Sequence, residues 1–182
     1  MAGKNNLDIS VRSTIRSATL QLEARARGAV DASTVRALNR TATTVRAQAS
    51  RKIRERYNLK AGVIKAQMKV LKATRSRLVA QIVAAGRRIP LIEFSARQTG
   101  KGVTARVTRA RRLYRGAFIT TMRSGHTGVF LRLGPERLPI KQLVGISIPK
   151  AMAERRIHAA LAKLAAERFA IEFVRDLRFR LG

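Results

Sequence analysis

The feature that most constrains this chain is an apolar stripe with helical spacing in its N-terminal third. Its members step along the chain by three or four residues: Val35, Leu38, Ala42, Val45, Ala49 and Ile53. This spacing places side chains on one face of an α-helix. Arginines occupy positions between them, so the segment predicts an amphipathic helix that ends near Tyr57 and packs one face on a core.

A similar stripe precedes this helix, and the link between the two stripes is ambiguous. Its members are Val11, Ile15, Ala18, Leu22 and Ala26. Gly28 interrupts the run, and either Asp31 or Ser33 could cap a new helix. The sequence leaves two possibilities open, namely two helices or one long helix bent at Gly28.

After residue 70 the period of the apolar residues changes from helical to alternating. Residues 60–69 first suggest a short helix. The segments that then favour strands or extended backbone are 78–84, 89–97, 103–107 and 129–133. In three of them the alternation of side chains between two faces predicts a strand. In 89–97 the Ile89–Pro90 step forces extended backbone and predicts a loop and a short strand. Residues 116–122 could form a strand or a helix.

Residues 153–182 return to helical spacing and predict a C-terminal helix, which follows an irregular segment. Residues 134–150 hold three of the four prolines and predict an ordered, irregular loop. The order of elements predicts an α+β fold, with N-terminal helices and a C-terminal helix packed on a mainly antiparallel sheet of about four to five strands. A length of 182 residues suits a single domain. Its expected parts are an N-terminal helical arm (1–57), a β-rich core (58–152) and a C-terminal helix (153–182).

The chain is strongly basic, with 39 Lys and Arg against 10 Asp and Glu and a net charge of +29. Such a field attracts polyanions and gives salt-sensitive, sequence-independent affinity for DNA or RNA. Solubility needs a net charge of only about 2–8, so we expect contacts with a polyanion. The same charge repels further copies of the chain.

Composition also indicates which residues form the core and in which cellular compartment the protein is made. Aromatic residues make up 4% of the chain and Trp is absent, so the core depends on Ala, Val, Leu and Ile. We therefore expect modest stability alone and further burial against partner subunits. The absence of Cys excludes disulfides and thiolate metal sites. The N-terminus resembles no secretory signal, and no window approaches the ~20 apolar residues that cross a bilayer. We expect a protein made soluble in a cytoplasm, with no membrane partner.

No pattern in the sequence supports catalysis, a metal or a cofactor. SARQTGKG (95–102) lacks the opening Gly and the final Ser or Thr of a phosphate-binding loop, so a hairpin turn is the better interpretation. His126 and His158 have no second His or carboxylate pair beside them. Glu93 is the only acid between Arg56 and Pro135, and an ion pair with a nearby Arg is its expected role. We therefore expect no enzyme and no catalytic, cofactor or metal site.

Several segments, taken in order, resemble the phage minor tail protein Z family. They are RALNRT (36–41), IPLIEFSAR (89–97), GVT (102–104), AFI (117–119), GHTGVFLR (125–132) and RLPIKQLVGISIPKAM (137–152). The resemblance implies a structural, tail-completion protein at the head-proximal end of a phage tail, in the neck where tail joins head. It implies a virion protein assembled in the host cytoplasm, and it carries over no catalytic residue.

The resemblance also implies partners. They are further copies of the chain in a ring, for which six is the working number, tail terminator or tail tube proteins, and head completion or connector proteins. Genomic DNA would pass through the ring. We hypothesise that Arg106, Arg109, Arg111 and Arg112 line this channel or meet acidic neighbours.

Residues 134–150 are the candidate docking loop, because a loop fixed by proline loses less freedom on docking. The candidate contacts are Phe130, Leu138, Pro139, Ile140, Leu143 and Ile146. If Val129 and Leu131 face the core, Phe130 points outward with Arg132. The alternative is that the loop residues cap the subunit's own core.

Two other functions compete with the neck protein. A general nucleic-acid-binding protein would explain the charge but not the ordered motifs. A small phage enzyme such as a nuclease would need clustered acids for metal, which the sequence lacks.

Overall fold

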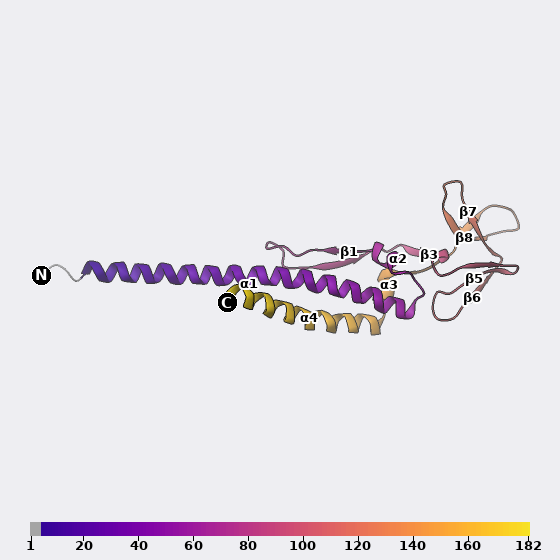
Figure 1. Cartoon of the computed structure of the whole chain (residues 1–182). Helices are drawn as coiled ribbons and strands as arrows, with labels where there is room; N and C mark the ends of the chain where they lie inside the picture. Colours follow the sequence, from indigo (N-terminus) through magenta and orange to yellow (C-terminus); the bar gives the residue numbers. More distant parts are fainter. Residues whose placement is uncertain (1–4) are drawn as a thin grey trace.

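The computed structural model describes the backbone from Asn5 to Gly182 and the side chains from Leu20 onward. Its main feature is α1 (Asn5–Arg56), a single helix of 52 residues and so about 78 Å long. α1 runs through Gly28, Asp31 and Ser33 without a break, so of the two open possibilities the single long helix is present, with no cap at Asp31 or Ser33 (Figure 1). One glycine in a helix costs about 1 kcal/mol, which the long helical segments on both sides can offset.

A second long helix lies antiparallel to the C-terminal part of α1 (Figure 1). The chain enters it through α3 (Ile148–Met152), a short helix with Pro149 in its first turn. After a turn at Ala153 and Glu154 it continues as α4 (Arg155–Leu181). The predicted C-terminal helix is therefore present as α4, and the short helix α3 precedes it. α4 ends beside the middle of α1, and α1 continues past it (Figure 1).

Between the helices the chain forms short strands. The helix α2 (Ala61–Ala66) comes first, and the 3-10 turn η1 (Leu91–Glu93) separates two strands. The strands are β1 (Met68–Leu71), β2 (Gln81–Ala84), β3 (Arg88–Pro90), β4 (Arg97–Thr99), β5 (Gly102–Ala105), β6 (Arg112–Arg115), β7 (Ala117–Thr121), β8 (Thr127–Arg132), β9 (Ile140–Gln142) and β10 (Val144–Ser147).

These strands pair antiparallel, which with the helices confirms the α+β class. They do not form one sheet of four to five strands. They form four small sheets instead, namely β1-β2, β3-β10, β4-β5-β6 and β7-β8-β9. Each strand spans three to six residues, and glycine or proline turns follow most of them, so no ladder is long enough to join the sheets into one.

The core lies where the end of α1 meets the strands. Its largest fully buried side chain is Phe94, just after η1. Around it lie the other large buried residues: Ile53, Ile64, Met68, Ile89, Leu91, Val103, Val129 and Ile148. By contrast, α1 buries mainly small residues farther toward its N-terminus, such as Ala37 and Ser33. The aliphatic core expected from composition is therefore present, with Phe94 at its centre.

Candidate partner-binding surfaces

The four arginines predicted as DNA or partner contacts lie together at the β5–β6 turn, and all four are exposed. Two of them also hold the turn in shape. Arg106 Nε donates to the carbonyl of Arg109 at 2.8 Å. Arg111 Nη1 donates to the carbonyl oxygens of Ser95 at 3.1 Å and Thr104 at 3.3 Å. Within residues 20–182, the side chains of Arg109 and Arg112 make no hydrogen bond or ion pair, so they are the more available contacts.

The predicted docking loop was expected to be ordered but irregular, and it contains two regular strands, β9 and β10. β10 pairs with β3, with Val144 opposite Pro90, and Leu91 N donates to the carbonyl of Leu143 at 3.0 Å. Leu143 and Ile146 are half-buried against the subunit's own core. Leu138 is 66% exposed and Pro139 is exposed beside it, whereas Ile140 is half-buried. The structure thus separates an exposed tip from residues that cap the core.

The prediction that Phe130 points outward is wrong. Phe130 is buried, with its ring 6.3 Å from that of Phe118 and 6.5 Å from that of His126. Phe118 on β7 and Gln142 on β9 lie directly opposite Phe130, so side chains on its own face of the sheet, together with His126, surround its ring. Val129 and Phe130 are both buried, and simple alternation fails on this strand.

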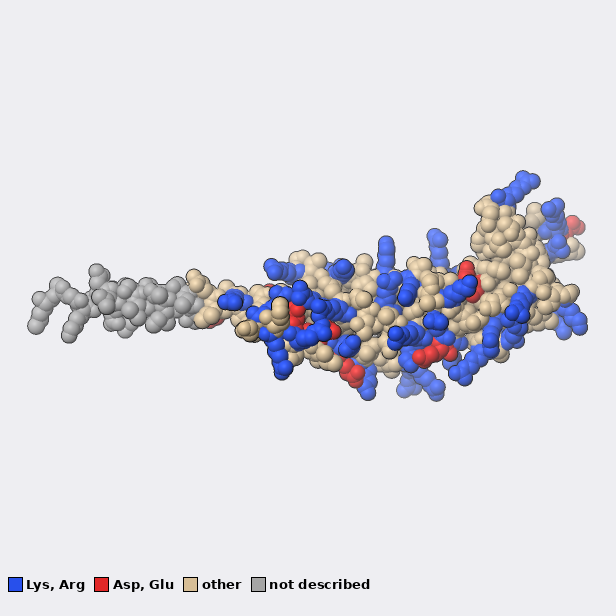
Figure 2. Space-filling model, viewed as in Figure 1, with Lys and Arg blue, Asp and Glu red and all other residues tan. Residues whose placement is uncertain are grey.

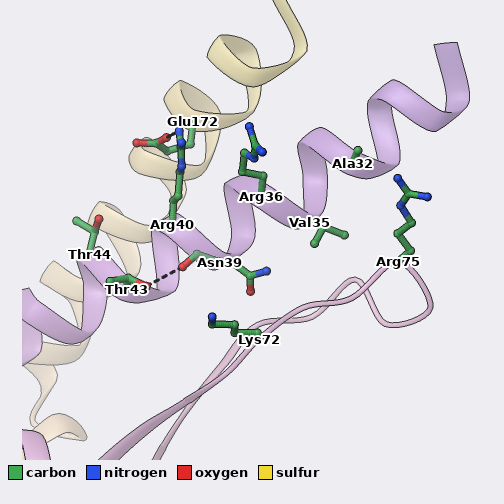
Figure 3. Close-up of a pocket in the computed structure, with 10 residues that line it drawn as sticks. All are labelled: Ala32, Val35, Arg36, Asn39, Arg40, Thr43, Thr44, Lys72, Arg75 and Glu172. Carbon is green, nitrogen blue, oxygen red and sulfur yellow. Dashed lines mark hydrogen bonds and ion pairs between the residues drawn. The ribbon is translucent and has the colours of Figure 1, made fainter. Parts of the chain in front are cut away.

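A basic groove between α1 and the β1–β2 hairpin was not predicted. It has a volume of about 620 Å³ and is lined by Ala32, Val35, Arg36, Asn39, Arg40, Thr43, Thr44, Lys72, Arg75 and Glu172 (Figure 3). Asn39 fixes its geometry with two hydrogen bonds to the backbone of Ala73. Asn39 Nδ2 donates to the Ala73 carbonyl at 3.0 Å, and Ala73 N donates to Asn39 Oδ1 at 2.7 Å. This contact holds Lys72 and Arg75 over α1.

The cations of the groove fall into two groups. Arg36 and Arg40 are neutralised by α4, since Arg36 lies 3.0 Å from Asp176 and Arg40 lies 3.2 Å from Glu172. Lys72 and Arg75 form no ion pair in the part of the chain with described side chains. The groove therefore keeps a net positive charge. Sequence spacing could not reveal it, because the hairpin folds back over a helix about 30 residues earlier in the chain.

The carboxylate of Asp176 on α4 is held in its charged form. Burial alone would raise the pKa of Asp176, but hydrogen bonds from Arg180 and Arg36, together with their charges, lower this pKa below its usual value. The expected ion pair of Glu93, which lies in η1, is not present among residues 20–182. Figure 2 shows Lys and Arg spread along the coloured surface, with only scattered Asp and Glu.

No group of three or more His, Cys, Asp or Glu is placed to hold a metal ion within the described part of the chain. Over the same residues, no helix is both long enough and apolar enough to cross a membrane.

Comparison with known proteins decides the family. The profile of the family described as prophage minor tail protein Z (GPZ) matches residues 14–182, nearly the whole chain. The chain belongs to the prophage minor tail protein Z family. Comparisons with curated proteins and with solved structures gave no match.

Membership of the minor tail protein Z family makes this chain a structural component of a phage tail, and so a virion protein that contacts other virion components. Two of the motifs that carry the resemblance meet in the fold. IPLIEFSAR supplies β3 and η1, while RLPIKQLVGISIPKAM supplies β10, which pairs with β3.

Proposed function

We propose that this minor tail protein acts at the head-proximal end of the tail as a tail-completion subunit. In this proposal several copies, with six as the working number, form a ring around the DNA channel and help to join tail to head. The role is structural rather than catalytic. The observation that carries the proposal is the excess of positive charge that the chain's own carboxylates leave unpaired, in a member of a tail-protein family.

The net positive charge of the chain requires negatively charged partners. Copies at +29 each repel one another strongly, so basic surfaces that face each other in a ring need DNA phosphates or acidic protein surfaces to offset their charge. Arg109 and Arg112 at the β5–β6 turn, and Lys72 and Arg75 in the groove, are placed to meet them. Neighbouring proteins of the tail and head, such as a tail terminator, tail tube or connector, would supply the acidic surfaces.

The exposed tip of the docking loop supports a second type of contact. Leu138 places an apolar side chain in solvent next to Pro139, at the end of a segment held by β9 and β10. Because the flanking strands hold the tip, docking would order few additional residues. Leu138 and Pro139 are therefore the proposed subunit or partner contacts, with Ile140 at their edge.

The direct test is a map of the phage neck that traces this chain, combined with two sets of variants. Changing Arg106, Arg109, Arg111 and Arg112 together to Gln is expected to lower ring-assembly yield and DNA retention. Unchanged infectivity with unchanged DNA retention would rule out their proposed role. A map that traces the chain elsewhere in the tail would rule out the neck position.

For the loop, Leu138→Gln is expected to reduce tail completion without loss of folding. Leu181→Gln is the matched control, since Leu181 is also largely exposed but lies at the end of α4, outside the proposed contact. Equal tail completion in both variants would contradict the docking role.

A general nucleic-acid-binding protein is the second candidate, and the open basic groove is the observation that favours it. Salt-sensitive DNA binding by the purified protein fits both functions. Its presence at the tail–head joint fits only the first.

A further inference from the structure

Among the residues with described side chains, the first turns of α1 pack on no other element. Every residue from Leu20 to Gly28 is exposed. The ion pair of Arg36 with Asp176 sets the register of α1 against α4, in which Leu181 lies five residues beyond Asp176. We call residues 5–28 the α1 extension, and Figure 1 shows it running past the end of α4.

The apolar line that is buried farther along α1 continues onto the extension. Ala29, Ser33 and Ala37 are buried, and they lie three or four residues apart. Stepping back by the same spacing gives Ala26 and then Leu22, which is 66% exposed. In the sequence the spacing continues to Ala18, Ile15 and Val11. Positions related by 11 residues, such as Leu22 and Ser33, complete three helical turns and so stay on one line along a nearly straight helix.

Charge indicates which partner can cover this line. The extension holds four arginines against two acids, a net charge of +2, in a chain of +29. Its arginines are Arg12, Arg16, Arg25 and Arg27, and its acids are Asp8 and Glu23. An acidic partner or DNA would find little to attract it here. A second copy of the chain is repelled by the other, basic surfaces, but it meets little repulsive charge at this segment.

We propose that the α1 extensions of two copies pack together along the line of Leu22 and Ala26. A long helix with an uncovered apolar line gains most of its stability from packing that line. The near-neutral extension lets two otherwise repelling subunits meet without DNA or an acidic protein between them. This pairing does not depend on a position in the neck.

The salt dependence of self-association separates this contact from nucleic-acid binding. Salt screens the repulsion between the basic bodies of the subunits, so pairing through the extension is expected to strengthen as salt rises. DNA binding by phosphate contacts weakens as salt rises. Sedimentation equilibrium of the full chain over a salt series, without DNA, measures the first effect directly.

Two alanines on the extension give a matched pair of variants. Ala26 and Ala24 are both exposed and two residues apart, but Ala24 lies about 200° around the helix from Leu22 and so off the apolar line. Ala26→Arg places a charge in the proposed contact and is expected to weaken self-association roughly tenfold or more. Ala24→Arg adds the same charge outside it and is expected to retain self-association.

A spin label provides a second measurement. The chain has no Cys, so Ala24→Cys gives one labelled site per copy. Pairing predicts a defined distance between labels on two copies, and adding Ala26→Arg is expected to abolish it.

Monomers at every salt concentration, or equal weakening by Ala24→Arg and Ala26→Arg, would overturn the proposal. If the wild type stays monomeric while Ala26→Arg alone blocks incorporation into tails, the line contacts another tail protein and pairing between copies is wrong. A neck position found to be wrong would change none of these readouts.

Discussion

Arg36 on α1 lies 3.0 Å from the carboxylate of Asp176 on α4, 140 residues later in the chain. Arg180 approaches the same carboxylate from within α4, with its Nε 2.7 Å from Oδ2. Asp176 is 4% exposed. Its buried charge therefore depends on these two arginines, and the pair fixes how far α4 reaches along α1.

Asp176→Asn is expected to lower the free energy of unfolding by about 1.5–3 kcal/mol, because it removes the charge that both arginines contact. Chemical denaturation measures this change. Glu167→Gln on the same helix is the control. Glu167 pairs with Lys163 at 3.9 Å and both side chains are largely exposed, so its loss is expected to change stability by less than about 1 kcal/mol. Equal effects of the two variants would contradict a structural role for the buried pair.

The lowered pKa of Asp176 predicts acid sensitivity. A group whose pKa is lower in the folded state stabilises the fold above its unfolded pKa, near 4, and loses that contribution as pH falls toward the folded value. The wild type is therefore expected to lose stability below about pH 4 more steeply than Asp176→Asn. Parallel curves of unfolding free energy against pH would show that Asp176 is not responsible.

The raised pKa of Tyr57, the residue after α1, predicts a loss of stability in alkali. Burial, and then the hydrogen bond that its hydroxyl donates to Glu154, raise the pKa of Tyr57. The resulting stabilisation is complete below the unfolded pKa, near 10, and is lost as pH rises through the folded value. Tyr57→Phe is expected to cost about 1 kcal/mol at neutral pH and to flatten the alkaline part of the stability curve. An unchanged slope above pH 10 would contradict this assignment.

Gly145, in the motif RLPIKQLVGISIPKAM, packs closely against Phe94, in the motif IPLIEFSAR. A Cβ at this position would lie 2.5 Å from a ring carbon of buried Phe94. Gly145→Ala is therefore expected to destabilise the fold by about 1–3 kcal/mol through overpacking, measured by thermal or chemical denaturation. Gly134→Ala is the control, because a Cβ there meets no atom within 4 Å. A stable Gly145→Ala would mean that Phe94 can move at no cost.

Lys72 and Arg75 should contribute to DNA affinity if the groove contacts phosphates. Lys72→Gln and Arg75→Gln are each expected to reduce the slope of log affinity against log salt by about 0.9. Lys163→Gln removes the same charge from the outer side of α4, where Lys163 is largely exposed. Equal slopes for Lys72→Gln and Lys163→Gln would indicate diffuse attraction and no groove contact.

The sequence by itself determined several of the local elements and the excess of positive charge. Helical spacing predicted α1 and α4, alternation predicted β2, β5 and β8, and the excess of Lys and Arg is a property of composition. These features depend on neighbours in the chain, so a sequence contains them directly. The ordered motifs likewise predicted the family.

Only the tertiary structure decided which residues are available. Phe130 is buried because Phe118, Gln142 and His126 surround its ring. Leu143 packs on the core beside the pairing of β10 with β3. The groove exists because Asn39 binds Ala73, 34 residues away. α1 runs past the end of α4 because the Arg36–Asp176 pair fixes the register of the two helices. Each outcome depends on contacts between distant segments, and residue spacing carries no record of where such segments meet.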